Sequence, residues 1–320
     1  MILNGNSLIL QLGKEDTYGT AATPTNQVRV SSESLKPVYN KVDEGLLTGG
    51  RGASRKEIMS LKTEGDISTL ARPDEVGLFF KAALGVESVD GNKHTFTALG
   101  TALSDSLPSL TAICDRKVDK FVYKGLKINS LSFSAAPEDY LKLDVSFVGK
   151  EEATGGSLAE LTPSSLKSFK FRHGKVKLAG TEVADITNIN FTYNNNLDAE
   201  TQTTSTGLYF KEPEPGKREI TTELEMLYTA GTEAYRASYY KTDAQVGIEL
   251  DFVSDETFGS DTPYSLKIII PCNQCTDASA NMTGADSTKQ TMNFEAVDNL
   301  TDELITVELV NDKADEYWIV

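Results

Sequence analysis

The sequence contains few of the residues from which metal centres and disulfide frameworks are built. Its 320 residues include three cysteines and two histidines. An odd and low cysteine count does not make the disulfide framework of a small secreted protein. A structural zinc site needs four ligands, and beside Cys272 and Cys275 there remain only Cys114, His94 and His173, none at a metal-ligand spacing. The sequence therefore predicts neither a metal nor a cofactor.

Signatures of catalysis are missing as well. The chain has no G-x-S-x-G and no H-E-x-x-H motif. His94 in "DGNKHTF" and His173 in "FRHGK" stand near glycines, so we interpret both as solvated turn residues rather than catalytic bases. Cys272 and Cys275 follow the predicted strand 264–271, whereas a redox-active pair should open a helix. We interpret them as ordinary thiols at a strand end and predict that the protein is not an enzyme.

Basic charge and long apolar runs are also scarce. The chain has 47 acidic against 31 basic residues and a formal net charge of −16. Such a surface repels nucleic acid and anionic membranes, because binding to phosphate needs clustered lysine and arginine. No apolar run approaches the roughly 20 residues of a membrane span, and the N-terminal stretch lacks the pattern of a signal peptide. We expect a protein that is made in a cytoplasm and has no membrane partner.

Alternation of apolar and polar residues is what the sequence has in quantity. In 139–150, Leu141, Leu143, Val145 and Phe147 alternate with polar residues, which is typical of a strand with one buried face. Similar runs predict strands at 32–40, 62–71, 124–136, 184–194, 217–227, 245–253, 264–271, 290–297 and 303–310. Helix start and stop signals predict helices at 72–85 and 231–241. The sequence thus predicts a mainly β protein.

The predicted elements recur in one order: strand, long loop, strand, helix, further strands. This order predicts an internal duplication, although the residues of the two halves differ. The first domain, 1–152, has an N-terminal arm and the long loop 41–61. The second, 153–320, has the long loop 195–216 and a C-terminal tail. We expect two tandem β-sandwich or half-barrel domains, each with a flanking helix, joined by a polar linker within 149–165.

A series of segments, taken in order, resembles phage tail tube proteins, also called major tail proteins. The segments are "GKEDTYGTAATPT" (13–25), "SSESLKPVYN" (31–40), "GGR" (49–51), "TEGDISTLARPDEVGLFFKAALG" (63–85) and the later "GLKINSLSF" and "YLKLDVSFVGKE". The resemblance covers most of the first half, and the second half only by pattern. It implies a structural virion protein without catalytic residues, made in the host bacterial cytoplasm. Such proteins form rings that stack into the tail tube, the channel for DNA passage into the host.

The resemblance also implies a stoichiometry. Rings of this family hold six tube domains, so chains with two domains would form a trimer with a pseudo-hexameric ring; a hexamer of chains is the alternative. We expect the strands at 32–40 and 62–71, with their second-half equivalents, to face the channel. An acidic wall would let DNA pass without specific binding. The expected partners are copies of the same chain, stacked rings and other tail proteins.

The glycine-rich stretch "EGLLTGGRGASRKEIMS" (44–60) does not have the glycine spacing of a phosphate-binding loop. We interpret it as a mobile loop that docks on the acidic surface of the adjacent ring, a contact that steers stacking more than it strengthens it. The predicted inter-ring contact residues are Leu46, Leu47, Gly49, Gly50, Arg51, Arg55 and Lys56.

An alternative function remains open at this stage. A soluble β-sandwich binding module, either carbohydrate-binding or adhesin-like, would also be rich in strands and poor in catalytic motifs. Such a module would carry an exposed aromatic platform. The chain has a single tryptophan, Trp318, near its C-terminus, which weakens this alternative.

Overall fold

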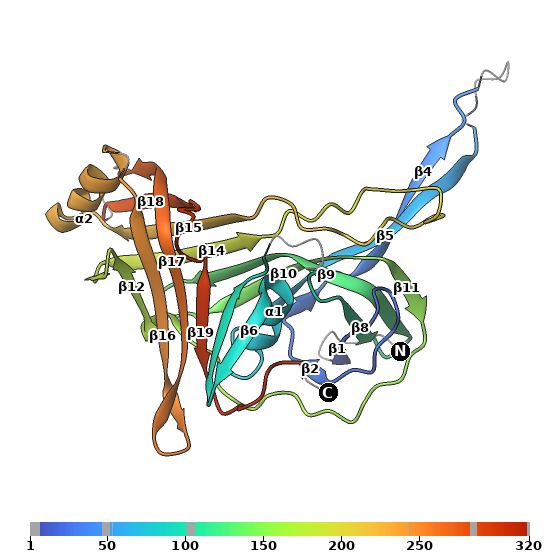
Figure 1. The fold of residues 1–320 in the computed structure, drawn as a ribbon, viewed down its shortest axis with the longest axis horizontal. Helices are drawn as coiled ribbons and strands as arrows, with labels where there is room; N and C mark the ends of the chain where they lie inside the picture. Colours follow the sequence, from blue (N-terminus) through green and yellow to red (C-terminus); the bar gives the residue numbers. More distant parts are fainter. Residues whose placement is uncertain are drawn as a thin grey trace.

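A computed structural model of the protein describes residues 7–46, 52, 54–100, 106–242, 244–281 and 287–318. The fold is mainly β, with two short helices, as the alternation predicts (Figure 1). Within the described residues, no helix has the length and apolar character needed to cross a membrane.

One antiparallel sheet, here called the long sheet, runs across the molecule (Figure 1). Its neighbouring strands are, in order, β4 (Lys36–Asp43), β5 (Lys56–Leu70), β10 (Lys142–Gly149), β9 (Lys120–Ala135), β14 (Ile186–Asn194), β15 (Glu219–Leu227), β18 (Lys289–Ala296) and β17 (Thr262–Ser279). A two-residue strand, β3 (Ser32–Glu33), extends β4 along the same side of β5.

The strand order of the long sheet is repetitive. The order β4–β5–β10–β9 recurs as β14–β15–β18–β17, and the pairing of β9 with β14 joins the two sets. The registers agree too, because Lys142 faces Leu70 in one set and Lys289 faces Leu227 in the other. The alternation of apolar and polar residues does not predict this strand order, because the order depends on contacts between segments far apart in the chain.

A shared irregularity makes the match closer. The register between β10 and β9 slips by one residue at Asn129. The register between β18 and β17 slips by one residue at Thr276. Each slip lies just before a buried phenylalanine of the partner strand, Phe147 or Phe294. A bulge bends its strand and raises the local twist, so both sets bend at the same place.

Helix α1 (Val76–Leu84) packs against the apolar face of the long sheet, beside β9. Every residue of α1 except Lys81 is buried. The ring of Phe80 stacks on Phe133 of β9, with ring centroids 5.4 Å apart. The helix ends at Gly85, whose φ of 92° is the left-handed conformation that glycine adopts without strain. The predicted helix at 72–85 is confirmed and begins four residues later than the start signals indicate.

Three smaller groups of strands complete the fold. β6 (Gly85–Asp90), β7 (Lys93–Ala98) and β19 (Thr306–Val310) form a sheet that joins one side of β17. The other side of β17 pairs with β16 (Val246–Phe258), followed by β12 (Gly174–Leu178) and β13 (Thr181–Val183). The N-terminal part of β9 pairs with β8 (Leu110–Asp115) and β11 (Glu151–Thr154); β8 leads on to β1 (Ile9–Lys14) and β2 (Asn26–Val28).

The second predicted helix, 231–241, is present as α2 (Ala230–Tyr235) and a π-helical turn, Arg236–Tyr240. The Thr229 hydroxyl accepts a bond from Thr232 N–H and caps the N-terminus of α2. Strands that the alternation missed include β1, β6 and β7, which are short or carry charged residues on their exposed side.

The interpretation of His94 as a solvated turn residue is wrong. His94 lies within β7, and its side chain and that of Glu87 are both fully buried. Its Nδ1 lies 2.8 Å from Glu87 Oε1, and its Nε2 lies 3.2 Å from Lys313 O. The C-terminal segment covers this pair, since Tyr317 N–H donates to Glu87 Oε2 over 3.0 Å. The burial thus depends on a segment more than 200 residues away, which local sequence does not reveal.

The interpretation of His173 as a solvated turn residue is also wrong, and so is the placement of the cysteine pair at a strand end. His173 is buried, and its Nδ1 accepts a bond from Lys170 N–H while its Nε2 contacts Asp255. Cys272 and Cys275 lie inside β17 rather than after a strand, because β17 continues to Ser279. Both thiols are free and buried. Burial raises the pKa of the Cys275 thiol to about 11, and the described residues contain no cluster of metal-ligating side chains.

We expect His94→Ala to lower the free energy of unfolding by about 3 kcal/mol, because it leaves the Glu87 carboxyl group buried without its closest partner. The shift in the midpoint of chemical denaturation measures this loss. His173→Ala is the matched control, and its loss should be much smaller, because Asp255 is 59% exposed. Equal midpoints for the two variants would contradict the structural role of His94.

Candidate assembly surfaces

A two-stranded ribbon, here called the first arm, projects from the body of the protein (Figure 1, upper right). It consists of β4, the N-terminal part of β5 and the connection between them, and its register runs from Tyr39 facing Leu61 out to Asp43 facing Lys56. The prediction of a long loop over 41–61 is therefore wrong at both ends, because strands cover 41–43 and 56–61. The β-branched residues Val42 and Ile58 favour the extended backbone, whereas the glycines between them are typical of a loop.

The first arm exposes several large apolar side chains. Tyr39, Val42, Leu46, Ile58 and Met59 have between 42% and 66% of their surface in contact with solvent. A two-stranded ribbon is marginally stable on its own, and clustered exposed apolar groups indicate an interaction surface. Sequence analysis selected Leu46 but missed the other four. The β-branched and aromatic residues in 36–43 and 56–61 are the signal that would have found them.

The predicted contact residues of the first arm are only in part described. Leu46, Arg55 and Lys56 are all exposed, and Lys56 is the first residue of β5. Leu47, Gly49, Gly50 and Arg51 lie outside the described residues.

The connection between β14 and β15, residues 195–218, is here called the second arm. It contains no strand and lies beside the first arm, as Leu208 O accepts a bond of 2.8 Å from Leu61 N–H. Gln202 Nε2 donates to Met59 O over 3.2 Å. The second arm occupies the same place in its set of strands as the first arm does between β4 and β5. The two arms therefore form one projecting structure.

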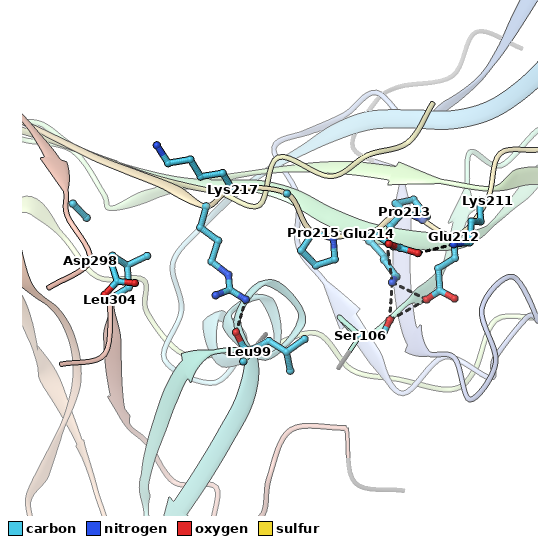
Figure 2. A pocket seen from close by; sticks show the side chains of 15 residues that line it. Leu99, Ser106, Lys211, Glu212, Pro213, Glu214, Pro215, Lys217, Asp298 and Leu304 are labelled. Atoms are coloured by element: carbon cyan, nitrogen blue, oxygen red, sulfur yellow. Dashed lines mark hydrogen bonds and ion pairs between the residues drawn. The ribbon is translucent and has the colours of Figure 1, made fainter. Parts of the chain in front are cut away.

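A hollow at the root of the second arm contains paired charges (Figure 2). Lys127 is buried, and its Nζ lies 2.7 Å from Glu212 Oε1 and 2.9 Å from Ser106 Oγ. Arg218, which also lines the hollow, donates to Leu99 O. These contacts join 211–218 to the body of the protein, so we interpret the hollow as the anchor of the second arm.

The long sheet has one apolar and one polar face. On β9, Leu131 and Phe133 are buried against the core, whereas Ser130, Ser132 and Ser134 point to the opposite side. The other strands continue this side, here called the polar face, with Lys36, Lys62, Glu64, Asp66, Ser68, Lys142, Asp144, Asn190, Thr192, Glu219, Thr221, Glu223, Glu225, Lys289, Thr291, Asn293, Glu295, Asp277 and Ser279. Carboxylates outnumber lysines among them, so the polar face is acidic.

Cross-strand contacts hold the side chains of the polar face. Asn190 Nδ2 donates to Glu223 Oε1 over 2.8 Å. The Lys289 ammonium lies 2.7 Å from Glu225 Oε1 and lowers the pKa of that carboxyl group. The carboxylate therefore stays ionised in mildly acidic solution, and the face keeps its negative charge.

The long sheet has open edges at both ends. Among the described residues, no strand pairs with the outer side of β4, nor with the side of β17 opposite β18 over 277–279. Lys36 and Asp277 are exposed at these edges. An open edge presents unpaired backbone groups, which are a template for pairing with another chain.

Comparisons with known proteins identify the family of the chain. A search of the curated proteins finds no match. A family model described as phage tail tube protein matches residues 5–296. Proteins of this family are structural components of the virion tail, are not enzymes and assemble as homo-oligomeric rings. Since the match spans most of the sequence, the resemblance found in the sequence is confirmed, and the chain belongs to the phage tail tube protein family.

Proposed function

We propose that the chain forms the wall of the tail tube from two tandem tube domains, 1–152 and 153–320. Three chains would close a pseudo-hexameric ring, with a hexamer of chains as the alternative. The observation that carries the proposal is the repeated four-strand set with its shared register slip. Two such sets in each chain give six in a trimer. Head-to-tail contacts of this kind close into a ring when the rotation fits.

The polar face lines the channel in this arrangement. The strands expected at the channel from the sequence were 32–40, 62–71 and their second-half equivalents. We extend this set to all the strands of the long sheet. Three chains contribute about 24 strands, and with about 4.8 Å between strands the barrel is roughly 40 Å across. The carboxylates of the face repel the phosphates of passing DNA, so that DNA slides toward the host without binding.

The arms connect successive rings in the same proposal. The apolar side chains of the first arm, Tyr39, Val42, Ile58 and Met59, become buried on the adjacent ring. Arg55 and Lys56, with Arg51 and the glycines Gly49 and Gly50, meet its acidic surface. Leu46 and Leu47 complete the contact. Rings stack through these contacts, and other tail proteins bind at the ends of the tube.

Electron microscopy of the purified protein tests the proposal. Concentrated samples should contain hollow tubes or isolated rings, because the open sheet edges and the first arm are satisfied only by further copies of the chain. A chain that stays monomeric at every concentration and ionic strength would contradict the proposed function.

A further inference from the structure

The pairing of β9 with β14 within one chain supplies a template for the contact between chains, if the ring proposed above exists. In this pairing Ser132 faces Thr192, and their hydroxyl oxygens are 3.0 Å apart. Leu131 faces Tyr193 in the same register. The template joins the last strand of the first four-strand set to the first strand of the second set.

Matching positions follow from the two registers. Lys36 faces Glu64, six residues before Leu70, and Thr192 faces Thr221, six residues before Leu227. Lys36 and Thr192 therefore occupy matching places, because Leu70 and Leu227 do.

The same comparison applies at the other edge. Ser132 faces Asp144, two residues after Lys142. Ser279 faces Thr291, two residues after Lys289. Ser279 in β17 thus matches Ser132 in β9.

We propose that β4 of one copy pairs antiparallel with β17 of the next copy in the register of the template. Lys36 then faces Ser279, Pro37 faces Ala278, and Val38 faces Asp277. The partner at this edge is a second copy of the chain. The pairing makes the polar faces of neighbouring copies continuous, and it places Lys36 diagonally beside Asp277 on that face, a favourable pair of opposite charges.

The backbone direction of β4 fits this pairing. Leu61 donates its N–H away from β4, to Leu208 O over 2.8 Å. Two residues that face each other in an antiparallel pair either exchange two backbone hydrogen bonds, or both point their N–H and C=O groups away from the partner strand. Tyr39, which faces Leu61, and Pro37, two residues earlier, therefore turn their backbone groups toward the open edge.

The proline at this edge meets a carbonyl group that has a donor already. Pro37 has no N–H to donate. On β17, Arg236 Nε donates to Ala278 O over 3.2 Å. The proposed register thus places the residue without a donor opposite a carbonyl that does not need one, while Ala278 N–H can donate to Pro37 O. A register shifted by two residues would lose this match.

Disulfide formation tests the register. Because Pro37 and Ala278 turn toward each other, Lys36 and Ser279 form a pair without mutual hydrogen bonds, with Cα atoms about 4.5 Å apart. This distance suits a disulfide, which needs about 4.4–6.8 Å. In assembled rings of the double variant K36C/S279C, mild oxidation should give a covalent ladder of chains on a non-reducing gel. Peptide mass spectrometry should find the link between residues 36 and 279.

Two variants make the outcome decisive. S132C/T192C carries the template pair and should form a disulfide within one chain, which shows that such a pair oxidises in this sheet. K36C/D277C is shifted by two residues, with Cα atoms about 7–8 Å apart, and should stay reduced. Rings that assemble without the 36–279 link, or that link the shifted pair instead, would overturn the register and leave the tube function standing. The absence of rings from the parent protein would overturn the tube function, and the pairing with it.

Discussion

Replacing residues 41–59 by the two-residue turn Asn-Gly is expected to abolish tube growth and to leave folded protein that still forms rings. The replacement removes Val42, Leu46, Ile58 and Met59, whose side chains are between 42% and 66% exposed. Tubes need these groups only if they bind the adjacent ring. Ring closure uses the sheet edges instead, so it should survive.

The shortened variant keeps the backbone geometry of the arm's base. Asn40 faces Ser60 at the point where the new turn joins. This pair exchanges hydrogen bonds, since its neighbours Tyr39 and Leu61 turn theirs away. Asn-Gly is the preferred two-residue turn between such strands. Of the contacts between the two arms described above, only the bond from Gln202 to Met59 O is lost.

Electron microscopy and sedimentation velocity would measure the effect. A milder variant, Val42→Asp with Ile58→Asp, should shorten or abolish tubes in the same way. The matched control is Val118→Asp with Leu300→Asp, two side chains that are 84% and 88% exposed outside the arms. Tubes of normal length from the shortened variant would refute the role of the first arm in stacking.

Glu15→Ala is expected to destabilise the fold by roughly 4 kcal/mol, because it leaves several buried donors without an acceptor. The Glu15 carboxylate is buried, and each of its oxygens accepts two bonds. Oε2 accepts from Gly19 N–H and Ser109 Oγ, both over 2.8 Å. Oε1 accepts from Thr111 Oγ1 and Gly125 N–H, also over 2.8 Å. The single side chain thus joins the N-terminal segment to β8 and β9.

The denaturation midpoint measures this effect, with Asp16→Ala as the control. Asp16 is the adjacent acidic residue and is exposed, so its removal should shift the midpoint little. Glu15→Ala should also raise the protease sensitivity of residues 15–25, which depend on this anchor. Equal midpoints for the two variants would show that the four hydrogen bonds contribute nothing to stability.

The strands of the long sheet that pack on the core could be predicted because each has one buried face, whereas β4 has no buried residue. On β10, Leu143, Val145 and Phe147 alternate with exposed or half-buried residues, and the prediction for 139–150 is confirmed. The pairing of β9 with β14 could not be predicted, because alternation defines the faces of a strand and leaves its neighbours open. The repeated order of strands became visible only through these long-range pairings.

Burial set by distant segments explains the residues that sequence reasoning placed wrongly. His94 follows a glycine turn, which favours exposure, yet Lys313 and Tyr317 cover it from the far end of the chain. The close approach of Tyr317 to α1 needs Gly77, because a Cβ there would overlap the Tyr317 ring. The first arm was misplaced for a related reason, because its exposed apolar residues have their expected partner on another copy of the chain.

The symmetry of the assembled ring tests the central claim most directly. Cryo-electron microscopy of the tube, reconstructed without imposed rotational symmetry, should show a three-fold ring of six similar units, with two kinds of unit alternating around the channel. The two kinds should differ at the arms, because the first is a β ribbon and the second contains no strand. Six identical units, each made by one whole chain, would contradict the account.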